Sequence, residues 1–188
     1  MANRADELGR VGNGELRMAG RDLNAESVTF RRAEVGDGAA VAAVFGAARA
    51  EMAYLPALHT PDEDRAFFTD RVVGSGSHDV TVAVAAAVAQ AEPKVSGGAQ
   101  MVGFCAVHAG WIEHLYVTPA WQGGEIGSAL LARAMAKNPG GLSLWVFEQN
   151  ERAAALYARA GFVVVERTDG LANEEHVPDL RMQWGGVG

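Results

Sequence analysis

The sequence predicts a single α/β domain built on a mixed β-sheet. Short runs rich in β-branched and apolar residues recur along residues 28–184, separated first by turns and later by helix-like segments. The early runs are joined by short connections, which is typical of antiparallel strands. Segments 111–118, 126–137 and 142–147 have the strand–helix–strand order of a parallel crossover. We therefore expect a central, mostly antiparallel sheet with one parallel βαβ crossover and flanking helices.

Composition excludes several classes of function. A chain of 188 residues that is 49% hydrophobic can form one domain with a sizeable core. Its net charge of -7 argues against a nucleic-acid surface and mildly favours a cationic partner. The apolar runs are too short to span a membrane, and no secretory leader is evident. The single cysteine, Cys105, excludes a disulfide within the chain and is expected to be a small buried hydrophobe. We expect a cytoplasmic protein without a metal, nucleic-acid or membrane partner.

The first half of the chain supplies one strand and two helices. Residues 1–27 lack periodicity and predict a mobile tail, which leaves 28–188 as the domain. A short strand is expected over 28–33 and an amphipathic helix over 36–52. A loop with two prolines leads to a second helix over 63–74, closed by a glycine.

The second half supplies most of the sheet. Runs 79–89 and 100–110 predict a hairpin, because the segment between them contains proline and glycines. The run 111–119 is rich in β-branched and aromatic residues and continues the sheet. The remaining expected elements are helix 126–137, strand 142–147, helix 151–160, strand 162–167 and strand 179–184.

A glycine-rich turn lies at the corner of the crossover. In "WQGGEIGSALLARA", which starts at Trp121, glycines occupy positions 123, 124 and 127, and a helical pattern follows at once. Glycines let backbone N–H groups turn inward, and the unpaired N–H groups of a helix N-terminus favour an anion. The turn therefore predicts a phosphate site, although Glu125 introduces a negative charge there.

Two motifs resemble the GNAT superfamily of N-acetyltransferases. "IEHLYVTPAWQGGEIGSALL" is similar to the family's strand and pyrophosphate loop, Q/R-x-x-G-x-G/A, and "NERAAALYARAGF" is similar to its downstream segment. With the flanking strands, the resemblance covers roughly residues 28–184. It implies the GNAT fold and direct transfer of an acetyl group from acetyl-CoA to a primary amine of a small molecule or peptide. Glu125 departs from the family, which prefers glycine there.

The resemblance also implies which residues bind acetyl-CoA. Backbone groups of the strand would contact the pantetheine arm, and the turn would wrap the pyrophosphate. Asn150 matches the second motif. The implied cofactor-binding residues are Leu115, Tyr116, Val117, Gln122, Gly123, Gly124, Ile126, Gly127, Ser128 and Asn150.

Attack of an amine on a thioester requires a neutral amine, an oxyanion stabiliser and a proton for the thiolate. The match to the family's N-x-x-A-x-x-x-Y motif implies that Tyr157 is the general acid, and seven residues place it on the same side of a helix as Asn150. The alternative is that Tyr157 packs in the core. Glu113 is the candidate base, because strand alternation puts it on the face of Leu115 and Val117. The alternative is a sheet carboxylate paired with a cation.

Two loops supply candidate substrate contacts. Tyr54 and His59 lie where the family's variable substrate lid falls, and Glu174 belongs to an acidic run beside the last strand. Solvated loops are the alternative in both cases. An acyl-CoA-binding module without catalytic activity and a purely structural protein remain alternative functions, and a homodimer is left open.

Overall fold

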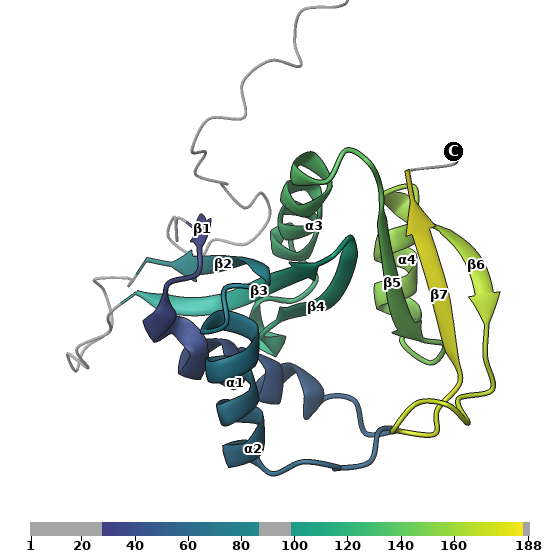
Figure 1. Ribbon diagram of the computed structural model, residues 1–188, viewed down its shortest axis with the longest axis horizontal. Coiled ribbons are helices and arrows are strands. Elements are labelled where there is room, and N and C mark those ends of the chain that lie inside the picture. The colour runs from purple at the N-terminus through teal and green to yellow at the C-terminus, as the bar shows by residue number, and fades with distance from the viewer. Residues whose placement is uncertain (1–27, 87–98, 186–188) are drawn as a thin grey trace, which may run out of the picture.

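The computed structural model describes residues 28–86 and 99–185, in which seven strands form one sheet (Figure 1). The strand order is β1-β2-β3-β4-β5-β7-β6. Every neighbouring pair is antiparallel except β4 and β5, which are parallel. This topology confirms the expected mixed sheet and its crossover. The strands are β1 (Val28–Arg32), β2 (Asp79–Ala85), β3 (Gln100–His108), β4 (Trp111–Val117), β5 (Leu142–Phe147), β6 (Val163–Arg167) and β7 (Asp179–Trp184).

The helices follow the sequence pattern, with changes at their ends. The helix expected over 63–74 begins earlier, because Thr60 caps it and Glu63 returns a hydrogen bond to the Thr60 backbone. It then continues as a π-helix, and the helix expected over 36–52 ends at Arg49. The helical elements are η1 (Val35–Asp37), α1 (Gly38–Arg49), α2 (Pro61–Ala66), η2 (Phe67–Val73), η3 (Pro119–Trp121), α3 (Ile126–Lys137) and α4 (Glu151–Arg159).

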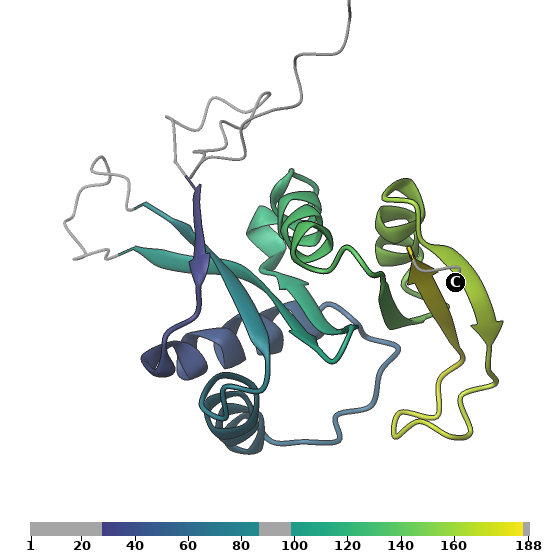
Figure 2. The same cartoon turned by 45° about the horizontal axis from the view of Figure 1, so that its top comes forward.

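The sheet carries a hydrophobic core on each face. On one face α1 and η2 bury residues such as Val41 and Phe68 against β2 and β3. On the other face Leu130 of α3 and Tyr157 of α4 pack over β4, β5 and β7. Figure 2 shows the two helix pairs on opposite sides of the strands. Both faces of the central strands are therefore covered, which explains why β3 is almost continuously apolar and buried.

The parallel pair is short. Trp111 pairs with Ser143 and Ile112 with Leu144, and within the described ranges no further residues pair between β4 and β5. The two strands then diverge, as Figure 1 shows. The second half of β4 consequently lacks a strand partner on that side.

The backbone of the second half of β4 is turned toward this opening. The Thr118 N–H donates to the Val102 carbonyl of β3, 2.9 Å away. In an antiparallel ladder, residues whose backbone groups face the partner alternate with residues whose groups face away. The backbone groups of Val117 and Leu115 therefore point away from β3, toward the space that β5 has left.

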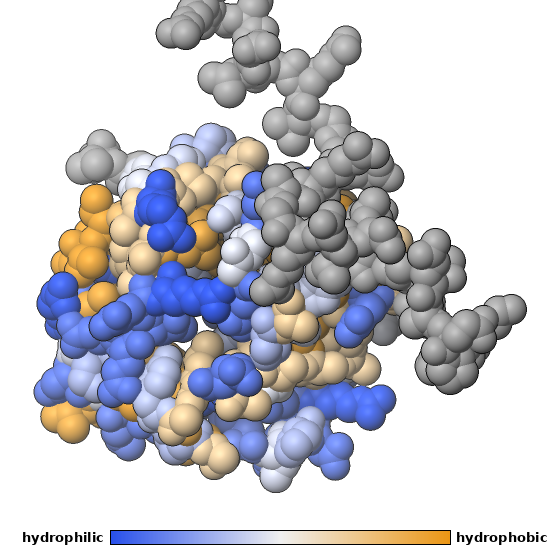
Figure 3. Space-filling model, turned by 180° about the vertical axis from the view of Figure 1, so that it is seen from behind, coloured by the Kyte–Doolittle hydropathy of each residue, from blue (hydrophilic) through white to orange (hydrophobic). Residues whose placement is uncertain are grey.

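One edge of the sheet is apolar. β6 is an edge strand, and Val163, Val164 and Val165 are exposed on it. Figure 3 shows hydrophobic residues gathered at the margin where β6 lies. A register shift between Val164 and Glu166 interrupts the ladder with β7, and such bulges disfavour further strand addition. The homodimer remains a prediction, and the predicted tail over 1–27 lies outside the described residues. None of the helices in the described ranges has the length and apolar character needed to span a bilayer.

Candidate acyl-CoA cleft

A cleft opens where β4 and β5 diverge. Its walls are the second half of β4, the glycine turn, the first turn of α3 and one side of α4. Ten of the residues proposed from the sequence line it: Leu115, Tyr116, Val117, Gln122, Gly123, Gly124, Gly127, Ser128, Asn150 and Tyr157. The side chain of Ile126 is instead buried in the core, so this residue can contribute only its backbone N–H to a ligand.

The glycine turn is braced on both sides. The Gln122 amide donates to the Val117 carbonyl at 2.9 Å, and its oxygen accepts from Arg152 of α4 at 3.0 Å. Gly123 has a φ of 81°, in the left-handed region that favours glycine. A Cβ at Gly123 would also lie 3.0 Å from the Arg152 guanidinium. These contacts fix the turn against both β4 and α4.

The N-terminus of α3 faces the cleft. Its first intrahelical bond runs from the Ala129 N–H to the Glu125 carbonyl, so the N–H groups of the first turn lack helical partners. Gly127 and Ser128 of that turn line the cleft. A Cβ at Gly127 would stand only 3.5 Å from Leu156. The small residue therefore keeps the cleft open between α3 and α4.

The charges around the cleft show whether Glu125 opposes an anion there. Glu125 is the N-cap residue of α3, its side chain makes no capping bond, and it is exposed. The ionisable lining residues with a fixed charge are Arg152 and Arg159, and no carboxylate or histidine lines the cleft in the described ranges. The lining of the cleft is therefore positively charged, and Glu125 does not cancel this charge because it is exposed to solvent.

Arg152 and Arg159 are the functional candidates that the sequence reasoning missed. They are seven residues apart on α4, as are Asn150 and Tyr157. The spacing argument that placed Tyr157 beside Asn150 would also have placed the two arginines on one side of the helix. The spacing could not indicate that this side of α4 contacts the glycine turn.

Tyr157 belongs both to the core and to the cleft. Its ring lies 5.7 Å from that of Phe162, centroid to centroid, and the residue is buried while lining the cleft. Burial raises the pKa of its phenol well above the usual value. The hydroxyl therefore stays protonated throughout the neutral range. α4 begins at Asn150, whose side chain accepts the Ala153 N–H at 3.1 Å, as expected of an N-cap.

The structure does not place Glu113 at the cleft. Ala106 pairs with His114 and Val107 with Ile112, so Glu113 is an extra, bulged residue in β4. A bulge interrupts the alternation of side chains from which the face of Glu113 was predicted, and Glu113 is not among the residues that line the cleft.

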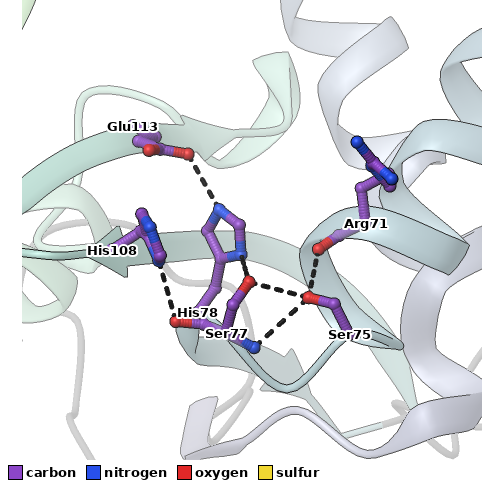
Figure 4. Close-up of polar contacts among 6 residues, drawn as sticks. All are labelled: Arg71, Ser75, Ser77, His78, His108 and Glu113. Atoms are coloured by element: carbon purple, nitrogen blue, oxygen red, sulfur yellow. Dashed lines mark hydrogen bonds and ion pairs between the residues drawn. The ribbon is translucent and has the colours of Figure 1, made fainter.

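Glu113 instead forms an ion pair near the start of β2 (Figure 4). Its carboxylate lies 2.8 Å from His78 Nε2, and His78 Nδ1 lies 2.9 Å from the Ser77 hydroxyl. His108 contacts the Ser77 carbonyl at 2.9 Å. Glu113 is therefore held by a polar contact with an imidazole, which is closer to the structural interpretation of this carboxylate than to a role in the cleft.

Other reactive side chains are enclosed. Cys105 is buried, and desolvation raises the pKa of its thiol to about 12, which excludes a thiolate at neutral pH. His114 lies among aromatic rings of α1, η2 and β3, and burial lowers its pKa to about 4. Both residues therefore act as packing groups.

The proposed substrate contacts Tyr54, His59 and Glu174 lie outside the cleft, and two of them contact each other. His59 Nε2 is 3.5 Å from the Glu174 carboxylate, and Arg49 donates to Glu175 at 2.9 Å. These pairs join the α1–α2 loop to the β6–β7 loop, which lie side by side in Figures 1 and 2. Tyr54 lies behind them, with its ring 6.3 Å from that of Phe147.

The fold and the cleft together define a class. A mixed sheet whose parallel pair splits beside a glycine turn is the acyl-CoA N-acyltransferase architecture. Residues 79–164 match the family model described as "Acetyltransferase (GNAT) domain". This part of the chain is therefore similar to a GNAT acetyltransferase domain, in agreement with the sequence resemblance. A search of the curated proteins finds no match.

Solved structures share the fold. The apo form of YjaB from Escherichia coli is 24% identical with a TM-score of 0.62, covering 85% of this chain and 99% of that one. NAA60 from Arabidopsis thaliana, solved with a bisubstrate analogue, is 18% identical with a TM-score of 0.60 and coverages of 84% and 98%. The putative acetyltransferase yncA from Salmonella typhimurium, solved with acetyl-CoA, is 19% identical with a TM-score of 0.60 and coverages of 84% and 93%.

Proposed function

We propose that the protein is an acetyl-CoA-dependent N-acetyltransferase that acetylates a primary amine of a small molecule or peptide. The observation that carries the proposal is the convergence, in one cleft, of a helix N-terminus, two arginines and a buried phenol. The Salmonella structure contains acetyl-CoA and the Arabidopsis structure a bisubstrate analogue, which supports the same use of this fold.

The residues present fit the phosphates of acetyl-CoA. The free N–H groups at the start of α3 and the left-handed turn at Gly123 form a concave donor surface. Arg152 and Arg159 add positive charge from α4. Because Glu125 is exposed, its repulsion is screened by solvent and weakens phosphate binding only slightly.

β4 supplies the contacts for the thioester arm. The Val117 and Leu115 backbone groups point into the opening, and the Val117 carbonyl already accepts from Gln122. The Val117 N–H is therefore the donor best placed to stabilise an oxyanion. Acetyl-CoA, when bound, supplies the activated acyl group, and no serine or cysteine nucleophile is needed.

Tyr157 is the proposed proton donor. Its hydroxyl keeps its proton at neutral pH because burial raises its pKa, and the residue lines the cleft. A phenol in this state can donate to the departing thiolate. The described lining holds no carboxylate or histidine, so the amine loses its proton to water. We expect turnover to rise with pH toward the pKa of the amine.

Two measurements test the proposal. Calorimetry with acetyl-CoA should show binding, and a thiol-release assay across a panel of amines should show turnover. Binding without turnover for any amine would favour the acyl-CoA-binding module, and no binding at millimolar acetyl-CoA would leave only a structural role.

A further inference from the structure

A second cavity lies outside the acyl-CoA cleft. It measures about 410 Å³ and lies between the outer half of β5 and the loop that joins β6 to β7. Cavities of this size are typical of sites for small molecules. Its lining includes Trp145, Phe147, Asn173, Glu175 and Asp179.

Among the described residues, the ionisable side chains that line this cavity are the carboxylates of Glu175 and Asp179. Asp179 is one of the few buried polar residues, and its two oxygens accept hydrogen bonds from Thr168 and Asn173. Those donors are neutral, and Asp179 takes part in none of the ion pairs among the described residues. Asp179 therefore has no partner of opposite charge among the described residues, while the nearby Arg49 and Arg181 are paired with Glu175 and Glu166. This arrangement favours a cation in the cavity.

The β5 side of the cavity is aromatic, and Phe147 pairs across the strands with Asp179. Trp145 is 44% exposed on β5, and Phe147 follows two residues later on the same face. An exposed indole gains by contact with an apolar group, and its ring face also attracts a cation. The cavity therefore suits a ligand with an amine at one end and an apolar body at the other.

A small polar cluster connects the cavity to the acyl-CoA cleft. Glu175 lines the cavity and accepts a hydrogen bond from Arg49. Arg49 follows Ala48, which lines the cleft, so the pair of Arg49 and Glu175 lies between the cavity and the cleft. An amine held near Glu175 is therefore close to the wall of the candidate acyl-CoA cleft.

The same cluster contains an unsatisfied group. The Tyr54 hydroxyl is the buried side-chain polar atom that lacks a hydrogen-bond partner in the part of the chain described. Its ring packs against Phe147, which lines the cavity. A buried hydroxyl without a partner is destabilising, and a ligand could supply that partner.

On the basis of the proposed function, we propose that the second cavity selects the acceptor as a cationic aryl- or alkylamine without a carboxylate. Glu175 and Asp179 attract the ammonium group, which must lose its proton before attack, and Trp145 and Phe147 contact its apolar body. An acceptor carboxylate would meet both acidic side chains, and Arg49, the nearby cation, is engaged by Glu175.

A matched pair of substrates tests the proposal. Phenethylamine and phenylalanine share a ring and an amine and differ in the carboxylate. We expect kcat/KM for phenethylamine to exceed that for phenylalanine by at least about tenfold. Equal or reversed preference would overturn the proposal while leaving acetyl transfer intact.

A matched pair of variants tests the residues. Glu175→Gln should raise KM for phenethylamine about tenfold with little change in kcat or acetyl-CoA affinity. Asp169→Asn, at an exposed carboxylate of the same loop that does not line the cavity, should change KM less than twofold. Equal effects of the two changes would refute the assignment.

Tyr54→Phe provides a second test, which does not alter the ion pair between Arg49 and Glu175. Its melting temperature should not fall, because the removed hydroxyl is unpaired, while KM for phenethylamine should rise about threefold. An unchanged KM would remove Tyr54 from the site. If no amine is acetylated, the proposed function fails, and calorimetry of phenethylamine with the full chain still decides whether the cavity binds amines.

Discussion

The two halves of β4 belong to one strand but differ in their pairing and in their surroundings. At the first half, Ile112 pairs with both neighbouring strands, Glu113 bulges out to His78, and His114 is enclosed by aromatic rings. At the second half, Leu115 and Val117 line the acyl-CoA cleft. The difference begins where β5 stops pairing with β4.

This contrast shows how a sheet can present free backbone groups beside the glycine turn. A backbone group that is paired within a ladder is not available to a ligand, whereas a strand that has lost its neighbour presents N–H and C=O groups at fixed spacing. We therefore expect changes at the second half to affect chemistry and binding, and changes at the first half to affect stability.

The largest expected effect is at Tyr157. Tyr157→Phe keeps the ring and removes the hydroxyl, so kcat should fall by about 10²–10⁴-fold if the phenol donates the proton. Melting temperature and acetyl-CoA affinity should stay close to those of the parent. A kcat within about threefold of the parent, when chemistry limits the rate, would remove Tyr157 from the mechanism.

The second-largest effect is expected for Gly127→Glu. The new carboxylate enters the cleft between Leu156 and Val117, and two like charges ~4 Å apart repel by ~4 kcal/mol at an effective dielectric of 20. Acetyl-CoA affinity measured by calorimetry should fall more than about 100-fold. Gly127→Ala is the control, because a methyl group there makes ordinary contacts. Retained affinity in Gly127→Glu would place the anion site elsewhere.

The pH dependence of protein stability tests the role of His114 in the enclosed first half of β4. Burial lowers its pKa from 6.5 to about 4, so the unfolded chain binds more protons than the folded chain between these values. Stability is therefore lost as pH falls through this window, by about 2 kcal/mol between pH 7 and pH 5. Urea unfolding at the two pH values should show this loss, and His114→Phe should reduce it. Parallel pH dependence in parent and variant would contradict the assignment.

Glu113→Gln tests most directly whether the first half of β4 takes part in catalysis. A base at this position would make turnover depend on it, whereas the ion pair with His78 predicts a loss of stability below about 1 kcal/mol and a turnover within threefold of the parent. The pH–rate profile should also be unaltered. A large drop in kcat with acetyl-CoA affinity kept would return Glu113 to the mechanism.

The smallest effect is expected at Glu125. Because the carboxylate is exposed, Glu125→Gly should improve acetyl-CoA affinity by about threefold or less. Glu125→Gln removes the charge without adding backbone freedom and should act similarly. A marked loss of affinity in both variants would mean that this carboxylate has a specific role.

The sequence by itself determined the order of the elements, the parallel crossover and the position of the glycine turn. These features depend on local patterns: apolar periodicity, turn residues, and the Asn150 cap seven residues before Tyr157. Only element ends changed, as where Thr60 starts α2 earlier than the apolar pattern suggests.

Tertiary structure alone decided which residues meet. The bulge at Glu113 arises from the register of β4 on β3, and one extra residue interrupts the alternation on which the prediction for Glu113 depends. The contact of Arg152 with Gln122 joins residues 30 positions apart, and that of Arg49 with Glu175 joins residues 126 apart. Such contacts depend on how helices and loops pack on the sheet, because spacing along the chain specifies the face of an element but not the partner that covers it.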